Sequence, residues 1–235
     1  MNKKISIILC TYNEVNHIEE CINLVSKTLN NVEIIVVDDN SSDGTLKKLE
    51  KLKSTFNFKL FIRKDDRGLA SAQKKGFNES IGDFVGTIDV NSYDQILHFN
   101  NLAEKLNNGY DIAVLSRFVP GGGDERIFIR AFASKGIYLV SKFILGIQFN
   151  DFGSGIFLMK RELLKHAEKT LTTYAEWFIE FIYILNKKKF KIIEVPYVQK
   201  KDSNLSKSKS FGNIFTFLNL GIIYFLRILI TKIRN

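Results

Sequence analysis

Along the first half of the chain, short apolar runs alternate with segments in which apolar residues recur every three or four positions. The runs predict five strands, at 4–10, 33–39, 58–63, 84–89 and 111–116. The segments between them have the periodicity of amphipathic helices, at 15–29, 45–52, 68–80 and 96–106. Because the strands alternate with helices, we expect an α/β fold in which helices cover both faces of a central, mostly parallel sheet.

The pattern changes after Ser116. A glycine-rich loop leads to a long apolar helix near 127–145, then to a turn with a short strand at 150–160, a helix at 174–185 and a strand at 190–196. Residues 198–210 are polar and lysine-rich, which predicts a flexible loop, and residues 211–230 are apolar over about the thickness of a membrane. We therefore expect one domain over 1–210 and an apolar, basic C-terminal helix over 211–235.

This C-terminal helix is expected to be amphipathic. Asn219 and Arg227 interrupt it, and an arginine in the middle of a bilayer costs about 2.5 kcal/mol or more. On a helical projection the polar residues share one broad sector, and Leu218, Ile222, Phe225 and Leu229 lie opposite. The pattern favours an anchor that lies in the plane of the membrane, on its cytoplasmic face, over a helix that crosses it. The alternative is a core helix packed against the first domain.

The net charge of +9 is concentrated near the C-terminus. Eleven of the 34 basic residues and two of the 25 acidic ones lie at or after position 186, which leaves 23 of each sign before it. A neutral body with a basic tail argues against a nucleic-acid partner and suits contact with phosphates or a lipid surface. Cys10 and Cys21 lack metal-ligand spacing and are expected to be reduced core residues, and the N-terminus turns polar too early for a signal peptide.

Polar residues gather where three of the predicted strands end. The clusters are Thr11-Tyr12-Asn13-Glu14, Asp38-Asp39 and Asp89-Val90-Asn91. Because the carboxyl ends of parallel strands meet at one edge of a sheet, we expect a ligand site there. Helix capping, for example by Asp43, explains one such cluster but not three.

Other common kinds of site are not indicated. No glycine-rich nucleotide-binding motif follows a strand, the three histidines are scattered, and Ser154 lacks the strand-to-helix turn of a hydrolase nucleophile. Arg117 ends a predicted strand and Arg130 interrupts an apolar helix. Arginine binds phosphate through parallel hydrogen bonds, so this pair is a candidate phosphate site; the alternative is that both are solvated surface residues.

Several motifs occur in a characteristic order. They are Thr11-Tyr12-Asn13-Glu14, VVDDNSSDGT at 36–45, Asp89-Val90-Asn91, Ser116-Arg117-Phe118-Val119-Pro120-Gly121-Gly122, Asp151-x-x-Ser154-Gly155 and Glu194-Val195-Pro196. The series resembles the family 2 glycosyltransferases, which have the Rossmann-like GT-A fold, and within them the dolichol-phosphate (polyprenyl-phosphate) mannosyltransferase type. The resemblance covers residues 4 to about 210, and VVDDNSSDGT is its most specific part.

The resemblance implies roles for individual residues. A nucleotide-sugar would be held by Thr11, Tyr12, Glu14, Asp38, Asp39, Asp89, Lys201 and Lys207. A divalent cation, Mg²⁺ or Mn²⁺, would be held by Asp89 and Asn91, and an acceptor phosphate by Arg117, Arg130 and Ser134, with Asp89, Arg117 and Arg130 as catalytic residues. The chain departs from the family pattern at Ile156-Phe157, Lys201 and Asn204, and at Asn91, which replaces a second acidic ligand and which Asp94 could complement.

The implied activity is transfer of mannose or another hexose from a GDP- or UDP-sugar to a polyprenyl or dolichyl phosphate, with inversion. A phosphate monoester has a second pKa near roughly 6, so this acceptor is already an anionic nucleophile and needs no strong general base. The alternatives are a family 2 transferase that acts on a glycan or lipid-linked saccharide, and a catalytically silent subunit that binds a nucleotide-sugar. The expected partners are a membrane lipid surface and a membrane partner subunit.

Overall fold

The computed structural model describes residues 3–126, 128–171, 175–200 and 214–235, and for 214–218 it describes the helix alone. The strands are β1 (Ile5–Thr11), β2 (Val32–Asp38), β3 (Phe58–Ile62), β4 (Phe84–Ile88), β5 (Ile112–Ser116), β6 (Gly123–Asp124), β7 (Phe157–Lys160), β8 (Ile192–Pro196) and β9 (Val198–Gln199). The helices are α1 (Ile18–Thr28), α2 (Thr45–Leu52), α3 (Leu69–Glu79), α4 (Phe99–Asn107), α5 (Phe128–Leu145), α6 (Leu164–Ala167), α7 (Trp177–Lys187) and α8 (Ile214–Arg234), with 3₁₀ segments η1 (Val90–His98) and η2 (Arg161–Leu163).

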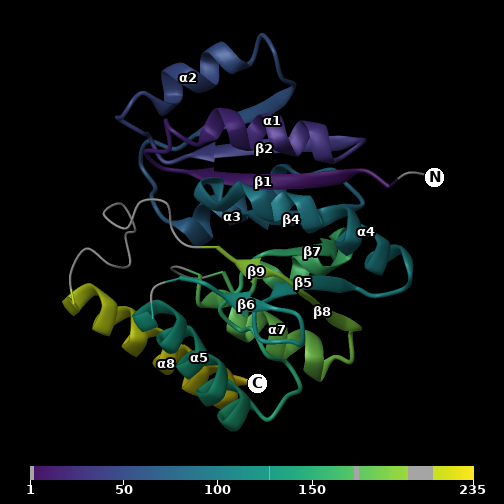
Figure 1. Cartoon of the computed structure of the whole chain (residues 1–235), viewed down its shortest axis with the longest axis vertical. Helices are drawn as coiled ribbons and strands as arrows, with labels where there is room; N and C mark the ends of the chain where they lie inside the picture. The colour runs from purple at the N-terminus through teal and green to yellow at the C-terminus, as the bar shows by residue number, and fades with distance from the viewer. Residues whose placement is uncertain (1–2, 127, 172–174, 201–213) are drawn as a thin grey trace.

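The main sheet has seven strands in the order β3-β2-β1-β4-β7-β5-β8 (Figure 1). Every neighbouring pair is parallel except those made by β7, which runs antiparallel to β4 and β5. Gly86 explains how closely β7 approaches β4, because a Cβ atom at this position would lie 2.5 Å from the carbonyl oxygen of Phe157. The α/β fold with a mostly parallel sheet is therefore confirmed, whereas the direction of β7 was not predicted.

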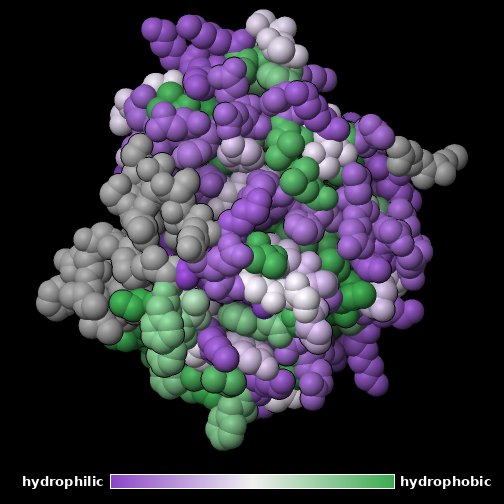
Figure 2. Space-filling view, in the orientation of Figure 1, coloured by the Kyte–Doolittle hydropathy of each residue, from purple (hydrophilic) through white to green (hydrophobic). Residues whose placement is uncertain are grey.

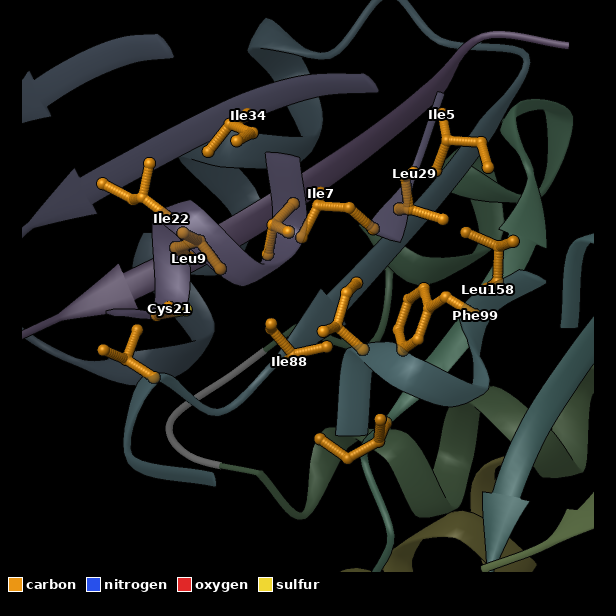
Figure 3. Packing of buried hydrophobic residues seen from close by; sticks show 14 of the residues in the cluster. Ile5, Ile7, Leu9, Cys21, Ile22, Leu29, Ile34, Ile88, Phe99 and Leu158 are labelled. Carbon is orange, nitrogen blue, oxygen red and sulfur yellow. The ribbon is translucent and has the colours of Figure 1, made fainter. Parts of the chain in front are cut away.

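Helices cover both faces of the sheet, as the apolar strands predict. On one face α1, α2 and α4 share one buried apolar cluster with β1, and Figure 3 shows Ile7 and Leu9 of β1 in this cluster together with Ile22 of α1 and Phe99 of α4. On the other face α3 and α7 pack around Trp177 and its aromatic neighbours. One predicted boundary was wrong: the helix expected at 96–106 is the 3₁₀ segment η1 followed by α4, with non-helical backbone angles at Ser92.

The register of the sheet brings the predicted polar clusters together. Thr11 pairs with Asp38 across β1 and β2, and Leu9 pairs with Ile88 across β1 and β4. The carboxyl ends of these three strands therefore lie side by side, with Asp89 following directly after β4. The prediction that the three clusters share one edge of the sheet is confirmed.

The C-terminal helix α8 packs against α5 and α7 at one end of the molecule (Figure 1). Its polar sector faces the protein: Arg227 lies 2.7 Å from the buried Glu180 of α7 and donates a hydrogen bond to the carbonyl of Thr170 at 2.6 Å. Its apolar sector, which includes Ile222, Phe225 and Ile230, is exposed. Among the described helices, none meets the length and hydropathy that a membrane span requires.

Candidate active site

The loops after β1 and β2 hold each other through side chains of the Asp38–Thr45 motif. Ser41 accepts a hydrogen bond from the amide of Asn13 at 2.9 Å, and Thr45 accepts one from the amide of Glu14, also at 2.9 Å. Asp38 has no exposed surface, and its carboxylate accepts hydrogen bonds from the hydroxyls of Thr11 at 2.7 Å and Ser41 at 2.6 Å. In this structure Asp38 and Thr11 position the loops and offer little surface to a ligand.

Asp39 is held by an arginine that the motifs did not include. Arg63, directly after β3, contacts Asp39 through two guanidinium nitrogens, with Nε donating at 2.7 Å. The amide of Gly68 donates to the other carboxylate oxygen at 2.9 Å. The guanidinium of Arg67 lies 3.6 Å from the ring centre of Tyr12. Both arginines follow β3. Because ligand sites lie at the carboxyl ends of parallel strands, this position alone marks them as candidate site residues.

Asp89 is the carboxylate at the centre of this edge. Its side chain is exposed to solvent, although protein atoms surround it densely and raise its pKa. The positive charges of Arg126, Arg130 and Arg117 oppose this rise in the pKa, so all three guanidinium groups act electrostatically on the Asp89 carboxyl. The fold therefore combines one exposed carboxylate with three arginines, which come from the position directly after β5, the loop after β6, and α5.

Arg117 has a different environment from the one the sequence suggests. Its side chain is 4% exposed, and it donates to both carboxylate oxygens of Asp151, at 2.8 and 2.6 Å. Asp151 is itself held by its backbone amide, which donates to Glu194 at 2.9 Å. A phosphate would reach Nε and Nη2 of Arg117 only after rearrangement of this buried pair, whereas Nη1 lies 3.5 Å from Asp124 instead. The Asp151 and Glu194 motifs thus have a structural explanation, because they fix the end of β5.

Arg126 stands in the more accessible position. Its guanidinium donates to Asp124 at 2.8 and 2.5 Å and to the hydroxyl of Ser134 at 2.9 Å. Ser134, one turn of α5 after the partly exposed Arg130, also accepts a 3.5 Å contact from Arg117. Ser134 and Arg130 thus lie in the arginine cluster, as the phosphate hypothesis requires, and Arg126 is an additional member that no motif signalled.

Comparison with known proteins decides the family. The sequence model of "Glycosyl transferase family 2" matches residues 6–167, more than half of the chain. The chain belongs to glycosyl transferase family 2. As a family 2 glycosyltransferase it places Tyr12, Asp39 and Asp89 on neighbouring strand ends, where α/β proteins bind ligands.

Two curated relatives cover most of this glycosyltransferase. It is 35% identical over 200 residues to a dolichol-phosphate mannosyltransferase of Pyrococcus furiosus, a match that covers 83% of the chain and 56% of the relative. It is 26% identical over 215 residues to a polyprenol monophosphomannose synthase of Mycolicibacterium smegmatis, covering 88% of the chain and 81% of the relative. The chain thus spans little more than half the length of the Pyrococcus protein.

Solved structures confirm the GT-A type of fold. Glucosyl-3-phosphoglycerate synthase from Mycobacterium tuberculosis, in complex with uridine diphosphate, superposes with a TM-score of 0.74 at 17% identity, covering 98% of this chain and 80% of that one. The same enzyme with Mn²⁺, uridine diphosphate and its product gives a TM-score of 0.70 at 18% identity. At this identity the likeness shows the fold alone.

Asp89 and Asn91 of this glycosyltransferase suit a divalent cation, and only Asp89 brings a negative charge. Asp89 offers an exposed carboxylate and Asn91 an exposed amide, and both are hard oxygen ligands. Asp94 lies 3.4 Å from Lys200 in a surface ion pair. The described residues contain no cluster of three or more histidines, cysteines or carboxylates that could bind a metal alone. Lys201 and Lys207 lie outside the described residues.

Proposed function

We propose that this family 2 enzyme transfers a hexose, mannose in the first instance, from a nucleoside diphosphate sugar to a polyprenyl phosphate. The observation that carries the proposal is the cluster of Arg117, Arg126 and Arg130 beside the exposed Asp89, which suits a reaction between two phosphate-bearing substrates. The names of the two curated relatives support the mannosyl group and the polyprenyl acceptor. The experiment below decides whether the donor is a GDP-sugar or a UDP-sugar.

The proposed chemistry is a direct displacement. The acceptor phosphate carries a negative charge at neutral pH and attacks the anomeric carbon, while the bond to the leaving nucleoside diphosphate breaks and the configuration inverts. The protein has to hold the two substrates in line and balance the charge of the leaving group. In this proposal Arg130 and Ser134 bind phosphate oxygens, and Tyr12 and Asp39 bind the nucleoside. A bound divalent cation would supply further positive charge beside Asp89 and Asn91.

The activity test is a panel of radiolabelled nucleotide-sugars. The full chain is incubated with vesicles that contain a polyprenyl phosphate, and the lipid phase is then extracted with organic solvent. We expect label from one donor, GDP-mannose or a UDP-hexose, to enter the lipid phase, in a product that mild acid releases. Label that enters only water-soluble glycan would indicate the glycan-acceptor alternative, and donor binding without any transfer would indicate the silent subunit.

Asn91→Asp is expected to tighten divalent-cation binding several-fold. The reason is that one added negative charge about 4 Å from a cation is worth about 1 kcal/mol even in bulk water. Binding of Mn²⁺, measured by electron paramagnetic resonance in the presence of the nucleoside diphosphate, gives a readout that does not depend on turnover. Asn100→Asp, at another exposed asparagine, is the matched control. Equal affinities in both variants would mean that position 91 is not a ligand.

In this proposal α5 and α8 together form the surface by which the enzyme binds a membrane. On α5, Phe128, Phe132 and Phe143 are 81%, 68% and 91% exposed, and they continue the exposed apolar sector of α8. Figure 2 shows hydrophobic residues gathered over this part of the molecule. A contiguous exposed apolar face beside the exposed cations Lys135, Lys232 and Arg234 suits the headgroup region of an anionic bilayer. This proposal places the active site at the cytoplasmic face of a membrane.

Phe132→Ser/Phe143→Ser is expected to weaken binding to anionic vesicles by about tenfold or more. Each phenylalanine that leaves water is worth about 1.5–3 kcal/mol. Vesicle flotation measures the effect, and Ile81→Ser/Leu97→Ser, at exposed apolar residues elsewhere, is the matched control. Equal loss in both double variants would contradict the proposed surface. Deletion of α8 is a poorer test, because it leaves Glu180 without Arg227.

A further inference from the structure

Two arginines contact a single carboxylate, that of Asp124. Its Oδ2 lies 2.5 Å from Nη2 of Arg126 and 3.5 Å from Nη1 of Arg117, and its Oδ1 accepts a hydrogen bond from Nε of Arg126 at 2.8 Å. The hydroxyl of Ser134 joins the group at 2.9 Å from Arg126. Two guanidinium groups that face one carboxylate, with a hydroxyl beside them, form an anion-binding arrangement within the protein.

The Asp124 carboxylate is a weak occupant of this position. It brings one negative charge and two oxygens, whereas a phosphate monoester brings a charge of about −1.5 to −2 and three oxygens that accept strong hydrogen bonds. A phosphate could therefore satisfy both arginines better than Asp124 does. We propose that Arg126 is a further phosphate-binding residue of the active site, and that Asp124 occupies its anion position until a phosphate displaces it.

The surroundings favour the phosphate of a lipid. Phe128 follows Arg126 by two residues and is 81% exposed, and its ring stacks on that of Phe132 with centres 6.0 Å apart. A phosphate bound to Arg126 would leave an attached hydrocarbon chain next to these exposed rings. The inference rests on the proposed function in this respect, since the donor's diphosphate shares the same chemistry. The alternative is that the Asp124–Arg126 pair only shapes the loop before α5.

The test measures phosphate binding by the full chain with two kinds of probe. Isothermal titration calorimetry is carried out with geranyl monophosphate, and separately with UDP and GDP in the presence of a chelator. Arg126→Gln is expected to weaken the affinity by about tenfold or more, because a hydrogen bond to a charged group is worth about 1.5–3 kcal/mol. Arg126→Lys should recover part of this loss. Asp124→Asn should tighten binding by about fivefold, the effect of one removed like charge.

Glu125→Gln is the matched control, since Glu125 is the exposed neighbour of Asp124. Thermal unfolding of each variant shows whether it is folded; if Asp124→Asn does not fold, Arg126→Gln alone decides. A response confined to UDP and GDP, without geranyl phosphate binding to the wild type, would support Arg126 as a phosphate ligand and contradict the lipid acceptor. If geranyl phosphate binds equally to the wild type and to Arg126→Gln, and UDP and GDP also bind unchanged, the inference is overturned while the proposed function stands.

Discussion

Asp89→Ala is expected to lower sugar transfer by about 10²–10³-fold or more, the usual cost of removing a preorganised charge-stabilising group. Asp89 directly follows β4, at the edge where the proposed nucleoside and phosphate residues lie, and it is an exposed carboxylate on which the three arginines act electrostatically. The stability of the protein should change little, because an exposed side chain contributes little packing energy. The measurement is initial rate of transfer to the lipid phase, together with thermal unfolding.

The matched control is Asp65→Ala, which removes an exposed carboxylate from the loop after β3. It should retain nearly full transfer. The affinity of Asp89→Ala for Mn²⁺ in the presence of nucleoside diphosphate should also fall, which separates a ligand role from a purely structural one. Transfer at the wild-type rate by Asp89→Ala in excess chelator would exclude the metal role of this residue.

Asp151→Asn is expected to destabilise the fold by about 3–5 kcal/mol, because it leaves Arg117 buried without its closest counter-charge. Arg117 would keep only Asp124, whose carboxylate lies 3.5 Å away. For a domain of this size the loss corresponds to a fall in Tm of about 6–20 °C, at about 2–4 °C per kcal/mol. Differential scanning calorimetry on the full chain measures it.

Asp65→Asn serves as the control here too, since it makes the same change of charge on an exposed loop. Its Tm should stay within about 2 °C of the wild type, in line with the effect of ordinary surface substitutions. If Asp151→Asn unfolds at the wild-type temperature, the buried pair does not stabilise the fold and Arg117 does not depend on Asp151 for its position. Arg117 would then be free to meet a phosphate, as the sequence alone suggests.

The sequence by itself determined the sheet and the place of the site. Runs such as 34–37 are apolar at every position, so they had to be buried strands, and their alternation with amphipathic helices left a doubly covered, mostly parallel sheet as the solution. In such a sheet the carboxyl ends of the strands meet at one edge, so Asp38, Asp39 and Asp89 had to share it. The pairing of Thr11 with Asp38 confirms this, because the prediction depends only on local pattern and strand direction.

Tertiary structure alone decided what each polar side chain faces. Asp38 and Asp39 are adjacent in the sequence, yet Asp38 is wholly buried against Ser41 while Asp39 meets Arg63. The sequence predicts that Arg117 binds a phosphate, but in the structure Arg117 forms a buried pair with Asp151, 34 residues away.

The same holds for the C-terminal helix. Periodicity separates the polar sector of α8 from its apolar sector, but it cannot say which of them the protein covers. Glu180, on another helix, decides this by drawing Arg227 inward, so that the apolar residues remain outside. Such pairings depend on contacts between residues that are distant along the chain, and a local sequence pattern does not identify the partner.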